Sequence, residues 1–185
     1  MPPAGLRPTL AIAALLCATA QAEAPPPATA EDMRIMDRYV GLFRSATQVF
    51  DDGRTEYHHL LRYEWFDRGE TIVKFTISMA IPSQDRVLTT GEGFYGYDAV
   101  EKRIYVFGAF SHGASGWGTL CELDHATGAR TVCARTSEPD GSFTHVRDSF
   151  EIVDADTWKN TTRARKSEDD DWAVVYEGRY TRVAD

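Results

Sequence analysis

The stretch that decides the fold is VKFTISMAI, residues 73–81. Its apolar side chains occupy every second position from Val73 to Ile81, and Lys74, Thr76 and Ser78 fall between them. Successive side chains of a β-strand point to opposite faces of a sheet, so this alternation predicts a strand with one buried face. The same alternation recurs in residues 57–65, 146–152 and 172–180. The pattern therefore predicts an all-β protein.

Turn-forming residues interrupt these strands at regular intervals. The turns centre near residues 52, 68, 83, 99, 113, 126, 140, 155 and 169, which lie 13 to 16 residues apart and separate ten strand-length segments. Turns this short join neighbouring strands antiparallel, because a parallel pair needs a crossover of a dozen or more residues. An open sheet of this size would leave long exposed edges, and closure removes them. We therefore predict a closed antiparallel up-and-down barrel of about ten strands.

One helix is predicted before the strands, over about residues 30–41. Thr29 can cap its N-terminus, and Glu31 and Asp32 stand in its first turn, where negative charge meets the positive end of the helix dipole. Apolar residues then follow at helical spacing, namely Met33, Met36, Tyr39, Val40 and Phe43. We expect this helix to plug or flank one end of the barrel.

Residues 1–22 have the three parts of a secretory signal peptide. Arg7 supplies the positive charge, residues 10–20 form a short apolar stretch, and Ala20-Gln21-Ala22 places small residues at the cleavage site. The apolar stretch is shorter than the roughly 20 residues that cross a bilayer, so no membrane span is expected. Cleavage near Ala22 predicts a periplasmic or secreted protein. Residues 23–30 then form a Pro/Ala-rich leader, and residues 31–185 fit a single barrel domain with its helix.

The composition excludes some classes of partner. Hydrophobic residues make up 43% of the chain, which is enough to build a core, and the net charge is −8. Nucleic acids and anionic membrane surfaces are bound by clustered Lys and Arg, so an acidic chain of this kind is not expected to bind them. The composition leaves the oligomeric state open.

Two cysteines remain once Cys17 has left with the signal peptide. Cys121 and Cys133 lie at equal distances from residue 127 in a predicted hairpin turn, so they can face each other on adjacent strands. An exported protein meets an oxidising environment, in which such a pair can form a disulfide. A one-residue bulge at Gly128 would spoil that register, so a disulfide and two buried thiols stay open as equal alternatives.

A resemblance to a known family rests on four segments: GEGFYGYD at residues 91–98, Lys102, GWG at residues 116–118, and residues 147–154. These segments resemble a bacterial family of secreted proteins that is catalogued as domain of unknown function 1579, and the likeness runs from about residue 55 to Arg182. The resemblance implies a lipocalin-like β-barrel and implies no catalytic residue or cofactor. Within these segments Gly91 and Gly93 are interpreted as bulges that let the strand bend.

No motif for catalysis, metal binding or a cofactor stands out. His58 and His59 are adjacent on a strand and so point to opposite faces, and neither a zinc-binding spacing nor a nucleophile elbow is present. We therefore expect no catalytic residue, no metal site and no cofactor. The candidates for a ligand site are Arg147 and the large aromatic residues expected to line the barrel, which are Trp65, Phe75, Tyr95, Tyr105 and Trp117.

The leading hypothesis for function is a barrel that binds a small, largely apolar ligand in its interior. One alternative is a lipocalin-like enzyme, an isomerase, cyclase or hydrolase, in which His145 or His59 works with Arg147 or Glu151 as acid and base. The other alternative is an interaction domain with a solid core. The residues alone exclude neither of these two alternatives.

The direction of the side chains in residues 145–152 separates these hypotheses. If His145, Arg147 and Glu151 point inward, the barrel contains a charged patch, and Arg147 can bind an anionic head group in a bidentate manner. If they point outward, they form an ordinary solvated face. The apolar residues Val146 and Phe150 occupy the opposite face of the same strand, which favours the outward direction.

Overall fold

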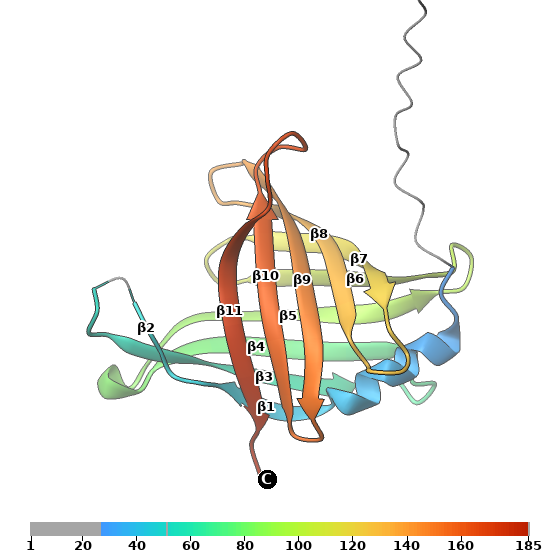
Figure 1. The fold of residues 1–185 in the computed structure, drawn as a ribbon, viewed down its shortest axis with the longest axis horizontal. Coiled ribbons are helices and arrows are strands. Elements are labelled where there is room, and N and C mark those ends of the chain that lie inside the picture. The colour runs from blue at the N-terminus through green and yellow to red at the C-terminus, as the bar shows by residue number, and fades with distance from the viewer. Residues whose placement is uncertain (1–26, 51, 185) are drawn as a thin grey trace, which may run out of the picture.

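The computed structural model describes residues 27–50 and 52–184, and within them eleven antiparallel strands form one sheet (Figure 1). A short helix, η1 (Ala30–Arg38), precedes the strands, and η2 (Pro82–Gln84) lies between two of them. The strands are β1 (Gly41–Ser45), β2 (Gln48–Val49), β3 (Glu56–Trp65), β4 (Ile72–Ile81), β5 (Arg86–Asp98), β6 (Arg103–Phe110), β7 (Ser115–Leu123), β8 (Arg130–Ser137), β9 (Phe143–Asp154), β10 (Thr157–Arg165) and β11 (Ala173–Arg182).

The sheet closes on itself through β1, which pairs with β11 on one side and with β3 on the other. Phe43, for example, lies opposite both Arg182 and Leu61. Ten of the described strands, β1 and β3–β11, therefore make a continuous ring in which neighbours along the chain are paired. The predicted closed antiparallel barrel is confirmed.

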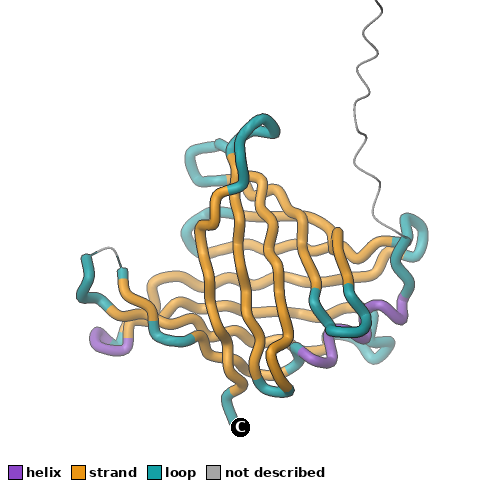
Figure 2. The backbone as a smooth tube through the Cα atoms, in the orientation of Figure 1, coloured by secondary structure: helices purple, strands orange, loops and turns teal. Residues whose placement is uncertain are grey.

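The eleventh described strand arises because the segment before the first turn is split. β2 pairs only with β3, whereas β1 is held between β3 and β11. The main chain leaves the ring after Ser45, where the amide of Ala46 donates to the carbonyl of Arg179 at 2.8 Å. Figure 2 shows the hairpin of β2 and the start of β3 extending away from the ring.

The helix η1 begins where the sequence predicts, after Thr29, but it is a 3-10 helix and ends at Arg38 rather than near residue 41. In a 3-10 helix, side chains three residues apart lie on one face. Met33, Met36 and Tyr39 have this spacing, and all three are buried. Because Gly41 already begins β1, the helix cannot continue to its predicted end.

One end of the barrel is closed by η1, and the other end is open. Inward-facing residues near η1 are almost fully buried, whereas inward-facing residues at the far ends of the strands, such as Phe110, Thr136 and Tyr176, are partly exposed. The buried set forms one continuous core of Met33, Met36, Tyr39, Phe43, Leu61, Tyr63, Val73, Tyr95, Ile104, Val132, Phe150, Trp158 and Tyr180. The barrel is therefore a cup whose base is packed.

A buried arginine lies in this base. Arg130 is only 2% exposed, and its guanidinium carbon lies 3.9 Å from the ring centroid of Tyr39, 4.4 Å from that of Phe150 and 4.7 Å from that of Tyr95. The faces of aromatic rings attract cations, most strongly where water is excluded. Arg130, which begins β8, therefore joins the residue that follows η1 to β5 and β9 in the closed end.

Glycines in β5 and β6 make room for a ring and do not form bulges. Gly93 lies opposite Phe75 and Gly108, and a Cβ at Gly93 would come within 2.0 Å of the carbonyl oxygen of Phe107 and 2.4 Å of the Phe75 ring. The register of β5 with β4 and β6 runs unbroken through Gly91 and Gly93. The interpretation of these two glycines as bulges is therefore wrong.

Cys121 and Cys133 are joined by a disulfide with Cα atoms 5.7 Å apart. They are not direct cross-strand partners, because Cys133 lies opposite Thr119, and Cys121 occupies a bulge between Leu120 and Glu122. The predicted symmetric register is thus wrong by two residues at Cys133, whose partner is Thr119 and not Cys121. A bulge does occur in this hairpin, but it lies in β7 and brings the two sulfur atoms together.

The predicted signal peptide, residues 1–22, lies outside the described residues, as do residues 23–26 of the leader. The described end of the leader contacts the barrel, since the amide of Ala28 donates to the carbonyl of Lys102 at 2.6 Å. Among the described residues, no helix has the length and apolar character needed to cross a bilayer.

We predict that Gly93→Ala destabilises the fold by about 1–3 kcal/mol, because the added methyl group meets backbone atoms that cannot move aside cheaply. The measurement is the midpoint of thermal unfolding. Gly96→Ala in the same strand is the matched control, since a Cβ there has no heavy atom within 4 Å. Equal midpoints for the two variants would contradict the close packing of Phe75 on Gly93.

Candidate ligand-binding site

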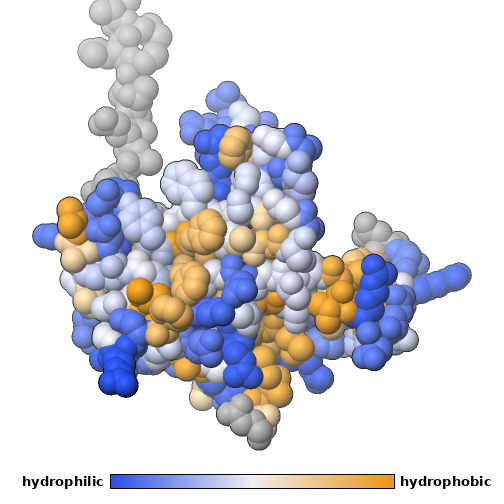
Figure 3. All heavy atoms as spheres, turned by 180° about the vertical axis from the view of Figure 1, so that it is seen from behind, coloured by the Kyte–Doolittle hydropathy of each residue, from blue (hydrophilic) through white to orange (hydrophobic). Residues whose placement is uncertain are grey.

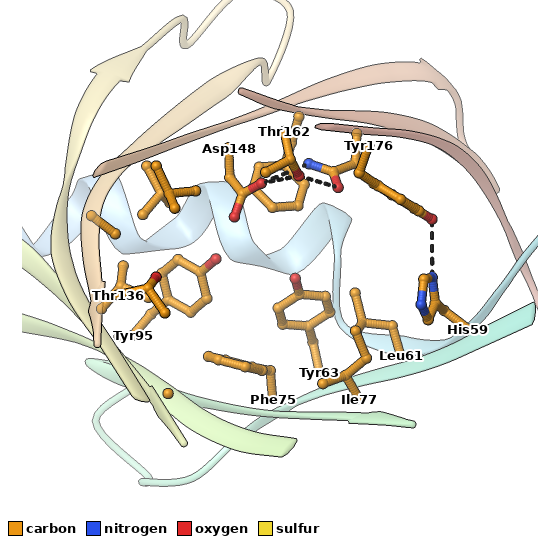
Figure 4. Close-up of a pocket in the computed structure, with 18 of the residues that line it drawn as sticks. His59, Leu61, Tyr63, Phe75, Ile77, Tyr95, Thr136, Asp148, Thr162 and Tyr176 are labelled. Carbon is orange, nitrogen blue, oxygen red and sulfur yellow. Dashed lines mark hydrogen bonds between the residues drawn. The ribbon is translucent and has the colours of Figure 1, made fainter. Parts of the chain in front are cut away.

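The open half of the barrel contains a cavity of about 300 Å³. Residues from β3–β11 line it, and Figure 4 looks into it with the N-terminal helix behind. Ligand sites in proteins are typically concave, mostly apolar and largely preformed, with a few polar groups that orient the ligand. The interior of this barrel is therefore not solid, whereas the interaction-domain alternative required a solid core.

One side of the cavity is apolar. Leu61, Phe75 and Ile77 from β3 and β4 form this wall, and Val106 continues it on β6. The ring of Phe75 meets those of Tyr95 and Tyr63 with centroids 5.7 and 6.1 Å apart. This wall can bury the apolar body of a small ligand.

The opposite wall carries a carboxyl group that is partly buried. Asp148 on β9 faces its cross-strand partner Thr162 on β10, whose hydroxyl donates to Oδ1 of the carboxyl group. The side-chain amide of Asn160 donates to the same oxygen at 3.5 Å. Burial raises the pKa of Asp148, and the hydrogen bonds from Thr162 and Asn160 and the charge of Arg130 oppose that rise.

A second polar cluster is formed by His59 of β3 with Tyr176 and Tyr180 of β11. The Nδ1 atom of His59 is 3.0 Å from the hydroxyl of Tyr176 and 3.3 Å from that of Tyr180, and the two hydroxyls are 2.9 Å apart. Burial, and secondarily the neighbouring His58, lowers the pKa of His59 to about 4. His59 is therefore neutral at neutral pH, and this cluster contributes polarity without charge.

Two of the aromatic residues predicted to line the barrel do so, namely Phe75 and Tyr95. Trp65 packs at the closed end, where its indole Nε1 donates to Asp37 at 2.9 Å. Tyr105 points outward between the inward-facing Ile104 and Val106, and its hydroxyl donates to Glu101 at 2.6 Å. The predictions for Trp65 and Tyr105 as cavity-lining residues are therefore wrong.

Trp117 borders the cavity, but its side chain is 61% exposed and shares the outer face with its cross-strand partner Phe107. Phe94 lies opposite Phe107 on the next strand, so an aromatic row crosses the outside of β5–β7. Figure 3, which shows the molecule from behind, displays apolar patches among hydrophilic residues on this face. The side chain of Trp117 points away from the ligand cavity, contrary to the prediction.

Arg147 also lies outside the barrel, where it pairs with Glu122 and its guanidinium carbon lies 5.8 Å from the Trp172 ring centroid. Strand alternation places His145 and Glu151 on the same outer face, opposite Arg135 and Lys159 respectively. Arg147 is therefore not a residue of the ligand cavity. An acid–base pair built from His145, Arg147 and Glu151 has no access to the barrel interior either.

Asp148 was not among the residues predicted for the site, although the sequence carries a pattern that identifies it. The inward face of β9 reads Val146, Asp148, Phe150 and Ile152, so the carboxyl group interrupts an apolar series. The same holds for Asn160, which follows Trp158 on the inward face of β10. A polar residue within the apolar half of an alternating strand is thus the pattern that identifies this cluster.

No group of three or more His, Cys, Asp or Glu side chains suited to a metal ion is found in residues 27–50 and 52–184. The polar groups of the cavity are instead a carboxyl, an imidazole, hydroxyls and an amide. Such groups can form hydrogen bonds with an organic molecule, and a carboxyl group can also bind a cation.

We predict that Asp148→Asn raises the midpoint of thermal unfolding near pH 8 by about 3 °C, which corresponds to roughly 1 kcal/mol for a chain of this length. The amide keeps the shape and removes a charge that burial disfavours. Because the folded state raises the pKa of Asp148 above its unfolded value, the wild type regains this stability as the pH falls and the group takes up a proton. The gap between the two proteins therefore narrows on acidification.

Differential scanning calorimetry between about pH 8 and pH 4 measures this gap, and Glu151→Gln on the outer face of β9 is the control. A variant that is less stable than the wild type at pH 8 would show instead that the charge of Asp148 stabilises the fold.

Comparison with solved structures supports the fold at the level of architecture. The chain is similar to the protein of a structure titled "Crystal Structure of Rv2717c from M. tuberculosis", with a TM-score of 0.60 and 11% sequence identity over 83% of this chain and 98% of that one. No protein-family model and no curated protein matches the sequence. At this identity the likeness shows a shared barrel-like fold and nothing about the ligand.

Proposed function

We propose that this protein binds a small, largely apolar ligand inside its barrel. The observation that carries the proposal is the open cavity of about 300 Å³, which has one apolar wall and one wall with a few polar groups. This volume lies at the lower end of the range for ligand pockets and suits a molecule of one or two rings. The closed end under η1 gives the cavity a rigid base, so little ordering is needed on binding.

We propose in addition that the protein is exported, that its first 22 residues are removed, and that it belongs to the family of domain of unknown function 1579. The disulfide between Cys121 and Cys133 supports export, because such bonds persist in oxidising compartments. The sequence features of a signal peptide, from Arg7 to Ala22, support it independently.

We predict that the neutral probe N-phenyl-1-naphthylamine binds the purified protein saturably, with increased fluorescence. Ala134→Trp should weaken this binding more than about tenfold, because Ala134 lines the cavity and the indole fills the space that the probe needs. Ala109→Trp is the matched control, since Ala109 is exposed on β6. Saturable binding that Ala134→Trp leaves unchanged would place the probe on the surface and contradict the proposal.

We predict that the full chain, expressed in a bacterium with two membranes, is recovered from the periplasm with the intact mass of residues 23–185 less two hydrogen atoms for the disulfide. Ala22→Arg removes the small residue at the cleavage site and should retain the longer chain. Recovery of the uncleaved wild type from the cytoplasm would overturn the proposal of export and leave that of ligand binding intact.

A further inference from the structure

The cavity offers no cation to a ligand, even though an arginine is buried close by. No Lys or Arg is among the described residues that line it. Arg130 is enclosed in the base by the rings of Tyr39, Tyr95 and Phe150, and its amino groups contact Met36 and the hydroxyl of Tyr63. The rings of Tyr63 and Tyr95 line the cavity and separate the guanidinium from it. A carboxylate in the cavity therefore has no cation to pair with.

Asp148 is the one carboxyl group among the described residues that line the cavity. The hydrogen bonds from Thr162 and Asn160 both end on Oδ1. Figure 4 shows one oxygen of Asp148 turned toward Thr162 and the other toward the middle of the barrel. Asp148 is partly exposed, and since it faces the interior, the surface it exposes is that of the cavity. The free oxygen is therefore an acceptor that a ligand can reach.

The charged and titratable groups around Asp148 leave its negative charge without a partner at close range. No salt bridge joins Asp148 to another described residue. The nearest polar side chains on β10 are the neutral Thr162 and Asn160, and the facing strands contribute the neutral His59 and the hydroxyls of tyrosines. A buried charge without a partner is costly, and a cationic ligand group removes that cost by pairing with it.

We propose that the ligand is an apolar ring system bearing a protonated amine, which donates to the free carboxylate oxygen of Asp148 while the rings pack against Phe75 and Ile77. This inference rests on the proposed function and names its ligand class. The same geometry rejects carboxylates, because the anion would lie beside Asp148 and far from any accessible cation. Neutral alcohols should bind with an affinity between those of amines and carboxylates, because a hydroxyl can donate a hydrogen bond but carries no charge.

The test uses three probes that share one ring system, namely 2-naphthylmethylamine, 2-naphthalenemethanol and 2-naphthoic acid. Isothermal titration calorimetry at about pH 7.5, with the chain from residue 23 onward, should give the amine an affinity about tenfold above that of the alcohol, with the acid weakest. Asp148→Asn should reduce the affinity for the amine to within about threefold of the affinity for the alcohol. The affinity for the alcohol should be nearly unchanged. The control Glu151→Gln removes an exposed carboxylate of the same strand and should keep the wild-type order of the three affinities.

The outcomes distinguish this inference from the function on which it rests. If the acid binds as well as the amine, or if Asp148→Asn keeps the amine preference, the role of Asp148 is overturned while ligand binding stands. If N-phenyl-1-naphthylamine binds in the cavity and the amine does not, the ligand class is wrong. If no probe binds, the proposed function falls as well. The comparison of the three probes on the wild type decides the matter even if Asp148→Asn does not fold.

Discussion

The contact on which the rest of this structure depends is that of the Arg130 guanidinium with the rings around it. A buried guanidinium is expensive unless aromatic faces and acceptors replace water. Here Tyr39 belongs to the segment that follows η1, Tyr95 to β5 and Phe150 to β9, and all three rings lie within 4.7 Å of the guanidinium carbon. The same group thereby attaches the helix to the barrel and closes its base.

The closed base also determines the chemistry of the open half. Because Arg130 is enclosed behind the rings of Tyr63 and Tyr95, its charge reaches the cavity only at long range, where it partly offsets the raised pKa of Asp148. The cavity is left with an anionic group, neutral hydrogen-bonding groups and an apolar wall. An arginine and an aspartate that could have neutralised each other in one ion pair are instead held apart, and only the aspartate faces the ligand space.

Much of the architecture could be predicted from the sequence, and less of the site could. The alternation in residues 73–81 and the spacing of the turns predicted the barrel, and Thr29 with the spacing of Met33 and Met36 predicted the helix. Large aromatic residues did not identify the interior reliably. In β6 both faces carry them, and in β7 the inward face carries glycines. Gly116 and Gly118 face inward beside Thr136 and Ala134, and the large side chain between them therefore lies outside.

By itself, the sequence determined that the chain forms antiparallel strands of regular length joined by short turns, because alternation and turn residues act locally. Alternation already favoured one face of each strand as the inner one, with Arg147 directed outward, but only the tertiary structure fixed that choice. It depends on closure of β1 against β11 and on the register of partners far apart in the chain. The position of Asp148 in the cavity and of Arg147 outside it follows from this choice. Neighbouring residues on one strand always take opposite faces, so a single register assigns one to the ligand and the other to solvent.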